Sequence, residues 1–98
     1  MLSAYPACFI KEENGYSVIF PDLNNLATCG NTLDEALAMS VDCLAGYLYC
    51  LQKDGEIFPK VSTPNEINLA KIAEELDVSS ESAFINIVTV DVAGSVNV

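Results

Sequence analysis

The stretch from Gly15 to Ala36 reads GYSVIFPDLNNLATCGNTLDEA, and it decides the fold because it combines two strands, a loop and a helix start in one run. Aromatic and β-branched residues alternate with their neighbours at its beginning, which predicts a β-strand with one buried face. The pair Asn14-Gly15 predicts a hairpin turn just before this strand, because both residues tolerate positive φ. A first strand is therefore expected over residues 3–12, where Pro6 marks an edge or a bulge because proline has no N–H to donate.

A long helix is predicted to begin at the end of this stretch. Thr32 and Glu35 have the spacing of a capping box. Apolar residues then recur at spacings of three and four, which predicts one buried face on a helix of about twenty residues. Lys53 suits the negative end of the helix dipole, and Gly55 can supply a left-handed cap. The residues expected on the buried face are Leu33, Leu37, Val41, Leu44, Leu48 and Leu51.

Two more elements are predicted after the long helix. Residues 66–77 combine apolar side chains at helical spacing with good helix formers, which predicts a short amphipathic helix. Residues 83–92 form a nearly continuous β-branched and aromatic run, which predicts a central strand with both faces covered. Residues 93–98 are expected to be a frayed tail. The sequence therefore predicts a single domain over residues 1–98 with the order β-β-β-α-(α)-β.

This order indicates the α+β class, with a mixed sheet and one long helix packed on it. A right-handed crossover through the long helix would place the last strand parallel to the first or the third strand. The alternative is a ferredoxin-like or double-stranded-RNA-binding-like sandwich with a helix over three or four strands. The order of the strands in the sheet distinguishes these possibilities.

The ordered motifs over residues 4–59 resemble the HicB antitoxin family. The resemblance implies a degenerate ribonuclease H-like domain that binds and blocks a small basic HicA-like toxin, an mRNA ribonuclease. Many family members continue into a C-terminal DNA-binding domain, and because this sequence stops at Val98 we expect none here. The matching motifs are Y-P-A at Tyr5–Ala7, two acids followed by G-Y-S-V at Glu12–Val18, F-P-D-L at Phe20–Leu23, A-T-x-G at Ala27–Gly30 and T-L-x-E-A at Thr32–Ala36.

The charge balance favours a basic protein partner. The chain has 14 acidic residues against 4 lysines and a net charge of −10, so we expect no direct binding to nucleic acid, whose phosphates need Lys or Arg. An acidic surface instead steers association with a basic protein such as the toxin. By the resemblance, the expected contacts are Glu12 and Glu13 in the first hairpin and Asp22, Leu23, Asn24 and Asn25 in the next loop.

Simpler interpretations of these residues stay open. Glu12 and Glu13 are also what a solvated hairpin would carry, and Asp22 is also a turn residue that accepts a local backbone bond. The apolar fraction of 51% is high for 98 residues, which indicates a homo-oligomer, a dimer or larger. No sequence resembling a secretion signal and no long apolar run is present, so we expect a cytoplasmic protein without membrane contact.

The composition argues against an enzyme. Without histidine the chain lacks a general acid–base of the usual kind and a Cys-His pair, and its isolated glycines form no phosphate-binding loop. A ribonuclease H-like nuclease would need a carboxylate on the first strand, and residues 3–10 contain none. We therefore expect no catalytic residue and no cofactor. The alternatives are an orphan HicB-like domain for oligomerisation or ligand binding and, third, a divalent-metal nuclease.

The cysteines do not indicate a metal site either. Their spacings contain no C-x-x-C, and the two on the long helix lie too far apart for a mutual disulfide. The cytosol keeps thiols reduced, so we expect them to act as small buried apolar residues. These cysteines are Cys8, Cys29, Cys43 and Cys50.

Overall fold

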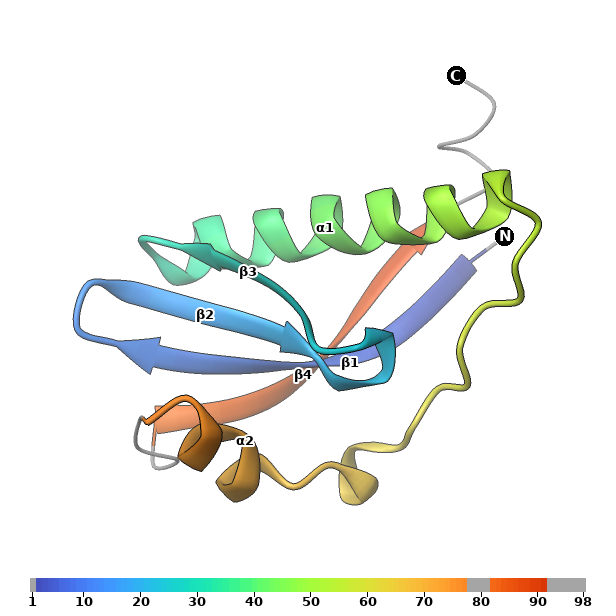
Figure 1. Cartoon of the computed structure of the whole chain (residues 1–98). Coiled ribbons are helices and arrows are strands. Elements are labelled where there is room, and N and C mark those ends of the chain that lie inside the picture. Colours follow the sequence, from blue (N-terminus) through green and yellow to red (C-terminus); the bar gives the residue numbers. More distant parts are fainter. Residues whose placement is uncertain (1, 78–81, 92–98) are drawn as a thin grey trace.

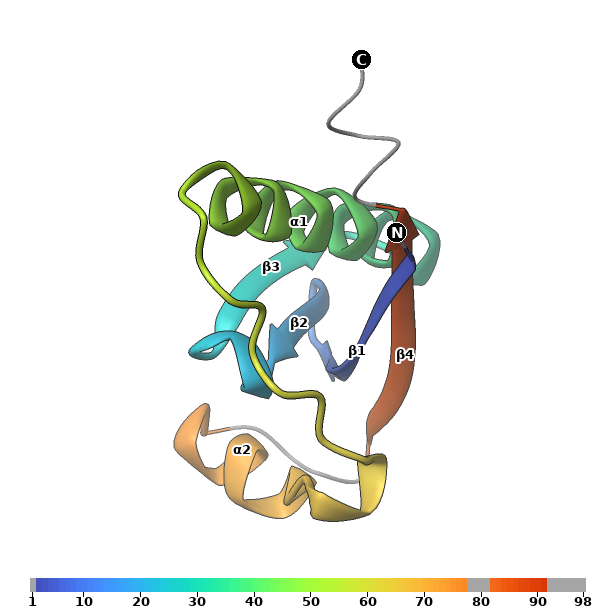
Figure 2. The same cartoon turned by 90° about the vertical axis from the view of Figure 1, so that its right-hand side faces the viewer.

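The computed structural model describes residues 2–77 and 82–91 as a sheet between two helices. Within these residues the four-stranded sheet has the order β3-β2-β1-β4, and its pairings are antiparallel. Helix α1 (Leu33–Lys53) lies over one face and the short helix α2 (Leu69–Glu75) lies over the other (Figures 1 and 2). The strands are β1 (Leu2–Glu12), β2 (Gly15–Phe20), β3 (Leu26–Gly30) and β4 (Ala83–Asp91), and 3₁₀ turns span Pro21–Leu23 and Pro64–Glu66.

The predicted α+β class and order of elements are confirmed. In the β1–β2 hairpin Glu12 pairs with Gly15, so Glu13 and Asn14 form the turn itself. Gly15 has φ +152°, a conformation that other residues rarely adopt. β1 lies inside the sheet, and Pro6 lies in the part of β1 that pairs with β4 alone. Only this part of β1 therefore has an unpaired side, as Pro6 predicted, and β1 as a whole is not an edge strand.

The last strand differs from its prediction in direction and position. β4 pairs antiparallel with β1, with Cys8 opposite Ile85, and among the described residues it is an edge strand of the sheet. The reason is the connector over residues 54–68, which runs back along the molecule after α1 (Figure 1). The chain consequently enters β4 at the end where β1 finishes. The expected frayed tail over residues 93–98 lies outside the described residues.

The sandwich alternatives also do not fit. A ferredoxin-like fold alternates as β-α-β-β-α-β, whereas this chain places three strands before its first helix. The two helices also lie on opposite faces of the sheet rather than together on one (Figure 2). In the described part of the chain, neither helix has the length and hydropathy needed to cross a membrane.

Both ends of α1 follow the predicted local signals. At its start the Thr32 hydroxyl accepts a hydrogen bond from the Glu35 amide at 3.1 Å. At its end Gly55 has φ +71°, and the Glu56 amide donates to the Leu51 carbonyl at 2.9 Å. This 6→1 bond, with its partner from Gly55 to Gln52, is a Schellman motif.

Four of the six residues predicted on the buried face of α1 lie on it: Leu44 and Leu48 are buried, and Leu37 and Leu51 pack against the core. The buried positions are spaced by four and include two small residues, Ala36 and Ser40. Leu33 and Val41 are instead 37% and 43% exposed. The first turn of α1 lies so close to β3 that a Cβ added at Gly30 would meet Ala36, so a small residue occupies the buried position there. The main core comprises Tyr5, Ala7, Phe9, Val18, Phe20, Leu23, Ala36, Leu44, Leu48, Val88 and Val90.

Helix α2 is shorter than predicted because its start is fixed by a separate cap. The Asn68 side chain accepts from the Lys71 amide at 3.0 Å, so the helix begins at Leu69 rather than near residue 66. The preceding residues form their own 3₁₀ turn, capped by Thr63 and Glu66. Ala73 is the buried residue of α2, which covers the sheet face opposite α1 (Figure 2).

Candidate partner-binding site

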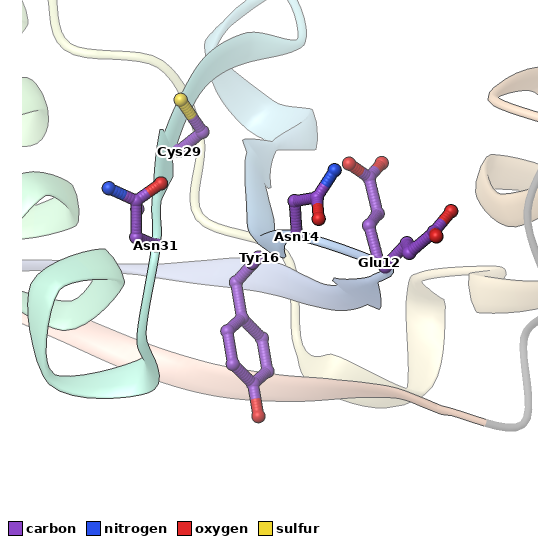
Figure 3. Close-up of a pocket in the computed structure, with 8 residues that line it drawn as sticks. Glu12, Asn14, Tyr16, Cys29 and Asn31 are labelled. Atoms are coloured by element: carbon purple, nitrogen blue, oxygen red, sulfur yellow. The ribbon is translucent and has the colours of Figure 1, made fainter.

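The first hairpin carries Glu12 and Glu13 at an exposed tip. Because Tyr16 pairs with Gly30, the end of β3 lies beside the start of β2. Between them is an open hollow of about 270 Å³. Figure 3 shows Glu12 and Asn14 on the hairpin side and Cys29 and Asn31 on the β3 side. The hollow therefore has a rim of carboxylates and amides.

The same end of the molecule gathers further negative charge. β1 and β3 finish there, and α1 begins two residues after β3 (Figure 1). We call the exposed carboxylates at this place the acidic end: Glu12, Glu13, Asp34 and Glu35. Lys11 is the neighbouring cation. On the far face of the sheet, α2 and the turn after it add exposed carboxylates at Glu74, Glu75 and Asp77. Such a surface attracts a basic partner and repels phosphate.

Four residues in the loop after β2 were predicted to contact a partner, and two of them, Asp22 and Leu23, have structural roles. Leu23 is 1% exposed in the core, so its side chain offers no surface and the contact predicted there is wrong. Asp22 accepts from the Ser62 amide at 2.7 Å and from the Ser62 hydroxyl at 2.6 Å. It therefore ties the connector to the sheet, over a separation of 40 residues rather than by a local turn bond.

A second tie holds the same connector. The Tyr5 hydroxyl donates to the Pro59 carbonyl at 2.6 Å. Burial, and secondarily the negative charge of Asp22, raises the pKa of Tyr5. The phenol therefore stays protonated and able to donate this bond at neutral pH. Together the two ties position the connector against the loop.

Asn24 and Asn25 remain exposed at the tip of the loop, with φ of 59° and 58°. They lie at the end of β2 away from the hairpin, so the structure does not bring the two predicted segments together. Asn25 lines a smaller hollow of about 150 Å³ with Ile19, Ala27 and α2. The predicted site is therefore divided, and the acidic end is its charged part.

The four cysteines carry free thiols in three different surroundings. Cys8 is buried, and burial raises its pKa to about 11. Cys29 and Cys50 are exposed, so the expectation of buried residues is wrong for these two. Cys8 in β1 and Cys29 in β3 are not on adjacent strands, because β2 lies between β1 and β3. Among the described residues, no group of three or more Cys, Asp or Glu side chains is placed to hold a metal ion.

These surroundings predict the order of thiol modification. At about pH 8 we expect N-ethylmaleimide to modify Cys29 and Cys50 rapidly in the folded protein and Cys8 only on unfolding, because about one Cys8 in a thousand is then a thiolate. Peptide mass spectrometry measures the order, and labelling in urea is the control. Fast labelling of Cys8 in native buffer would contradict the packing of β1.

The sequence profile of the family described as HicB_like antitoxin of bacterial toxin-antitoxin system matches residues 5–96. The chain belongs to this family. It is 39% identical over 62 residues to Antitoxin HicB 2 of Photorhabdus laumondii, covering 63% of this chain and 45% of the relative. It is 33% identical over 75 residues to Antitoxin HicB 1 of the same organism, covering 76% and 46%. The chain thus spans about half the length of these HicB relatives.

Solved structures agree with the HicB-like fold. A chain of a toxin–antitoxin complex from Streptococcus pneumoniae superposes with a TM-score of 0.85 at 32% identity, covering 97% of this chain and 73% of that one. The N-terminal domain of Burkholderia pseudomallei antitoxin HicB superposes with a TM-score of 0.61 at 26% identity, covering 91% and 99%. The antiparallel sheet with α1 across it is therefore the fold of HicB antitoxin domains.

Proposed function

We propose that this chain neutralises a small basic HicA-like mRNA ribonuclease in the cytoplasm by binding it through the acidic end. The observation that carries the proposal is the set of exposed carboxylates around the hairpin hollow, in a member of an antitoxin family. The proposed action is occupation of the toxin surface, without catalysis by this chain and without direct contact to nucleic acid.

Electrostatics supports this choice of surface. A ribonuclease must present basic groups to hold the phosphate backbone of its RNA substrate. Its substrate site is therefore complementary to closely spaced carboxylates. Glu12 and Glu13 are adjacent in sequence and exposed at a tight turn, where their charges can approach a concave basic site. The similar chain from Streptococcus pneumoniae comes from a toxin–antitoxin complex, which supports a toxin as the partner class.

Charge reversal at the hairpin tests the proposal. We expect Glu12→Lys/Glu13→Lys to weaken binding to a HicA-like toxin, sought first among the products of the neighbouring genes, by at least about tenfold. The matched control is Asp54→Lys/Glu56→Lys, which makes the same change in net charge at exposed positions beyond the other end of α1. Calorimetry at two salt concentrations measures both affinities, and growth rescue on co-expression gives the cellular readout.

The control separates local contact from overall charge. If both variants weaken the complex equally, net charge rather than the acidic end decides the affinity. If the unaltered chain forms no complex at micromolar concentration, the toxin-binding proposal is wrong and an orphan HicB-like role is favoured. Cleavage of RNA by the purified chain in Mg²⁺ or Mn²⁺ would instead support the nuclease alternative.

A further inference from the structure

The smaller hollow lies between the sheet and α2, which covers the face opposite α1 (Figure 2). α2 has seven residues and packs mainly against β4, so it covers the part of this face formed by β2 and β3 incompletely. The hollow has a volume of about 150 Å³, below the roughly 300–1,000 Å³ of sites for drug-sized ligands. It is therefore sized for a single side chain. We call it the α2 hollow, and its lining is Ile19, Asn25, Ala27, Ile72, Glu75 and Leu76.

The lining combines apolar surface with polar groups. Ile19 is 7% exposed and Leu76 is 41% exposed, so the apolar part extends from the sheet out to solvent. Asn25 and Glu75 are exposed, and within the described residues Glu75 is the charged group of the lining. An apolar ligand would leave this carboxylate desolvated without a partner, and a phosphate would be repelled by it. The α2 hollow therefore suits a ligand with an apolar stem and a cationic head.

An arginine side chain has this combination. Its methylene stem can lie along the apolar lining while the guanidinium stays at the wet rim. The planar guanidinium carries several N–H donors, so it can bond to the Glu75 carboxylate and the Asn25 carbonyl oxygen together. The ammonium of lysine is more strongly hydrated, which makes it less suited to a partly enclosed site.

β3 connects the α2 hollow with the acidic end. Ala27 lines the α2 hollow, and Cys29 lines the hollow beside the hairpin. Residues two apart on a strand point to the same face and lie about 7 Å apart at the usual rise per residue. Both side chains are exposed, whereas Thr28 between them is partly buried. A protein bound at the acidic end can therefore reach the α2 hollow along the same strand.

We propose that the α2 hollow receives an arginine side chain of the HicA-like toxin, with its stem against Ile19 and Ile72 and its guanidinium on Glu75. The inference rests on the proposed function, because it adds a second contact to a complex formed at the acidic end. The two contacts have different roles. The acidic end attracts any basic surface, whereas the α2 hollow selects the length and head group of one side chain.

Titration with N-acetyl-arginine amide tests the α2 hollow without the toxin. At millimolar concentrations we expect the probe to shift the NMR signals of Ile19, Ile72 and Glu75. The citrulline derivative has nearly the same shape without the charge and should bind about fivefold more weakly. Glu75→Gln should remove the difference between the two probes. The matched control Glu74→Gln neutralises the adjacent carboxylate of α2, outside the lining, and should preserve the difference.

Variants of the α2 hollow test its role in the complex. Calorimetry should show that Glu75→Gln weakens toxin binding about fivefold and that Ala27→Phe, which fills the hollow, weakens it at least about tenfold. Both variants keep the hairpin carboxylates, and circular dichroism checks that they keep the fold. Replacing the arginines of the toxin one at a time by alanine identifies the occupant. Only that substitution should be non-additive with Glu75→Gln in a double-mutant cycle.

The outcomes distinguish this inference from the proposed function. If Glu12→Lys/Glu13→Lys weakens the complex while Glu75→Gln and Ala27→Phe do not, the α2 hollow is not a contact and the proposed function stands. If only the variants of the hollow weaken it, the contact at the acidic end is wrong. Equal binding of the arginine and citrulline probes, or coupling of Glu75 to a toxin lysine, would overturn the choice of arginine. A chain that binds no toxin would overturn both proposals.

Discussion

Replacing Gly30 with alanine is expected to lower the free energy of unfolding by about 3 kcal/mol, at the upper end for overpacking a well-packed site. The added Cβ would lie 2.7 Å from the Ala36 Cα and 2.8 Å from the Glu35 carbonyl carbon, and it would also meet the Ala36 nitrogen. These are backbone atoms of the first turn of α1, which cannot move aside as a side chain can. The cost is one of space, since Gly30 is not among the residues with positive φ.

The surrounding contacts make relaxation difficult. Gly30 is fixed from the other side by Gly15, whose own added Cβ would meet the Gly30 carbonyl oxygen. The helix start is held in turn by the Thr32 cap. Moving α1 away from β3 would therefore expose Ala36 and loosen the seat of the whole helix. Any movement that relieves the clash at residue 30 loses packing between α1 and β3. We therefore expect most of the predicted loss in the free energy of unfolding to remain.

Urea unfolding followed by circular dichroism measures this effect. The matched control is Gly46→Ala, the same chemical change in open space, which should stabilise the dilute protein by about 0.5–1 kcal/mol through helix propensity. Opposite signs for the two variants are the expected result. A loss below about 0.5 kcal/mol for Gly30→Ala would show that α1 does not sit on β3 as closely as described.

Local signals explain why much of the fold was predictable. The first hairpin, the Thr32 cap and the Gly55 end each depend on residues within a few positions, and all three are confirmed, with the hairpin turn at Glu13-Asn14, one residue earlier than predicted. Alternation in β2 predicted its buried face because Val18 and Phe20 pack into one core. Sequence patterns that span only a few residues predict the local backbone geometry directly.

Contacts between distant segments explain the errors. The apolar run over residues 83–92 indicates a central strand, but its place in the sheet depends on how the connector returns, which no local pattern states. Within the predicted stripe, Leu33 and Val41 are exposed, and the close approach of α1 to Gly30 places the small residue Ala36 at the first buried position instead. In the candidate site, the exposure of Glu12 and Glu13 was predictable from the turn, whereas the burial of Leu23 and the partner of Asp22 depend on packing that spans the chain.

Asp22→Ala is expected to lower the free energy of unfolding by about 2 kcal/mol, because hydrogen bonds to a charged group contribute more than neutral ones. The substitution removes the acceptors of both the Ser62 amide at 2.7 Å and the Ser62 hydroxyl at 2.6 Å. Of the two ties described above, only the hydrogen bond from the Tyr5 hydroxyl to the Pro59 carbonyl then holds the connector. We therefore expect a local loosening of the connector in addition to the loss of global stability.

Trypsin provides the local readout, because Lys60 is exposed in the connector between the two ties. Cleavage after Lys60 should become faster in Asp22→Ala, while cleavage after Lys11 in β1 should change only with global unfolding. Ser62→Ala removes one donor and should cost about 1 kcal/mol. In a double-mutant cycle the two substitutions should be strongly non-additive, since they share the same bond. Additive effects would show that Asp22 and Ser62 act independently.

The same variant decides which role Asp22 has. If it acts only by holding the connector, Asp22→Ala should bind the toxin with nearly unaltered affinity at a temperature where the chain stays folded, and Asp22→Asn should recover part of the stability through its remaining carbonyl acceptor. If Asp22 instead contacts the toxin, affinity falls and unfolding is unchanged. The two bonds to Ser62 use both carboxylate oxygens, so the first result is the one we expect.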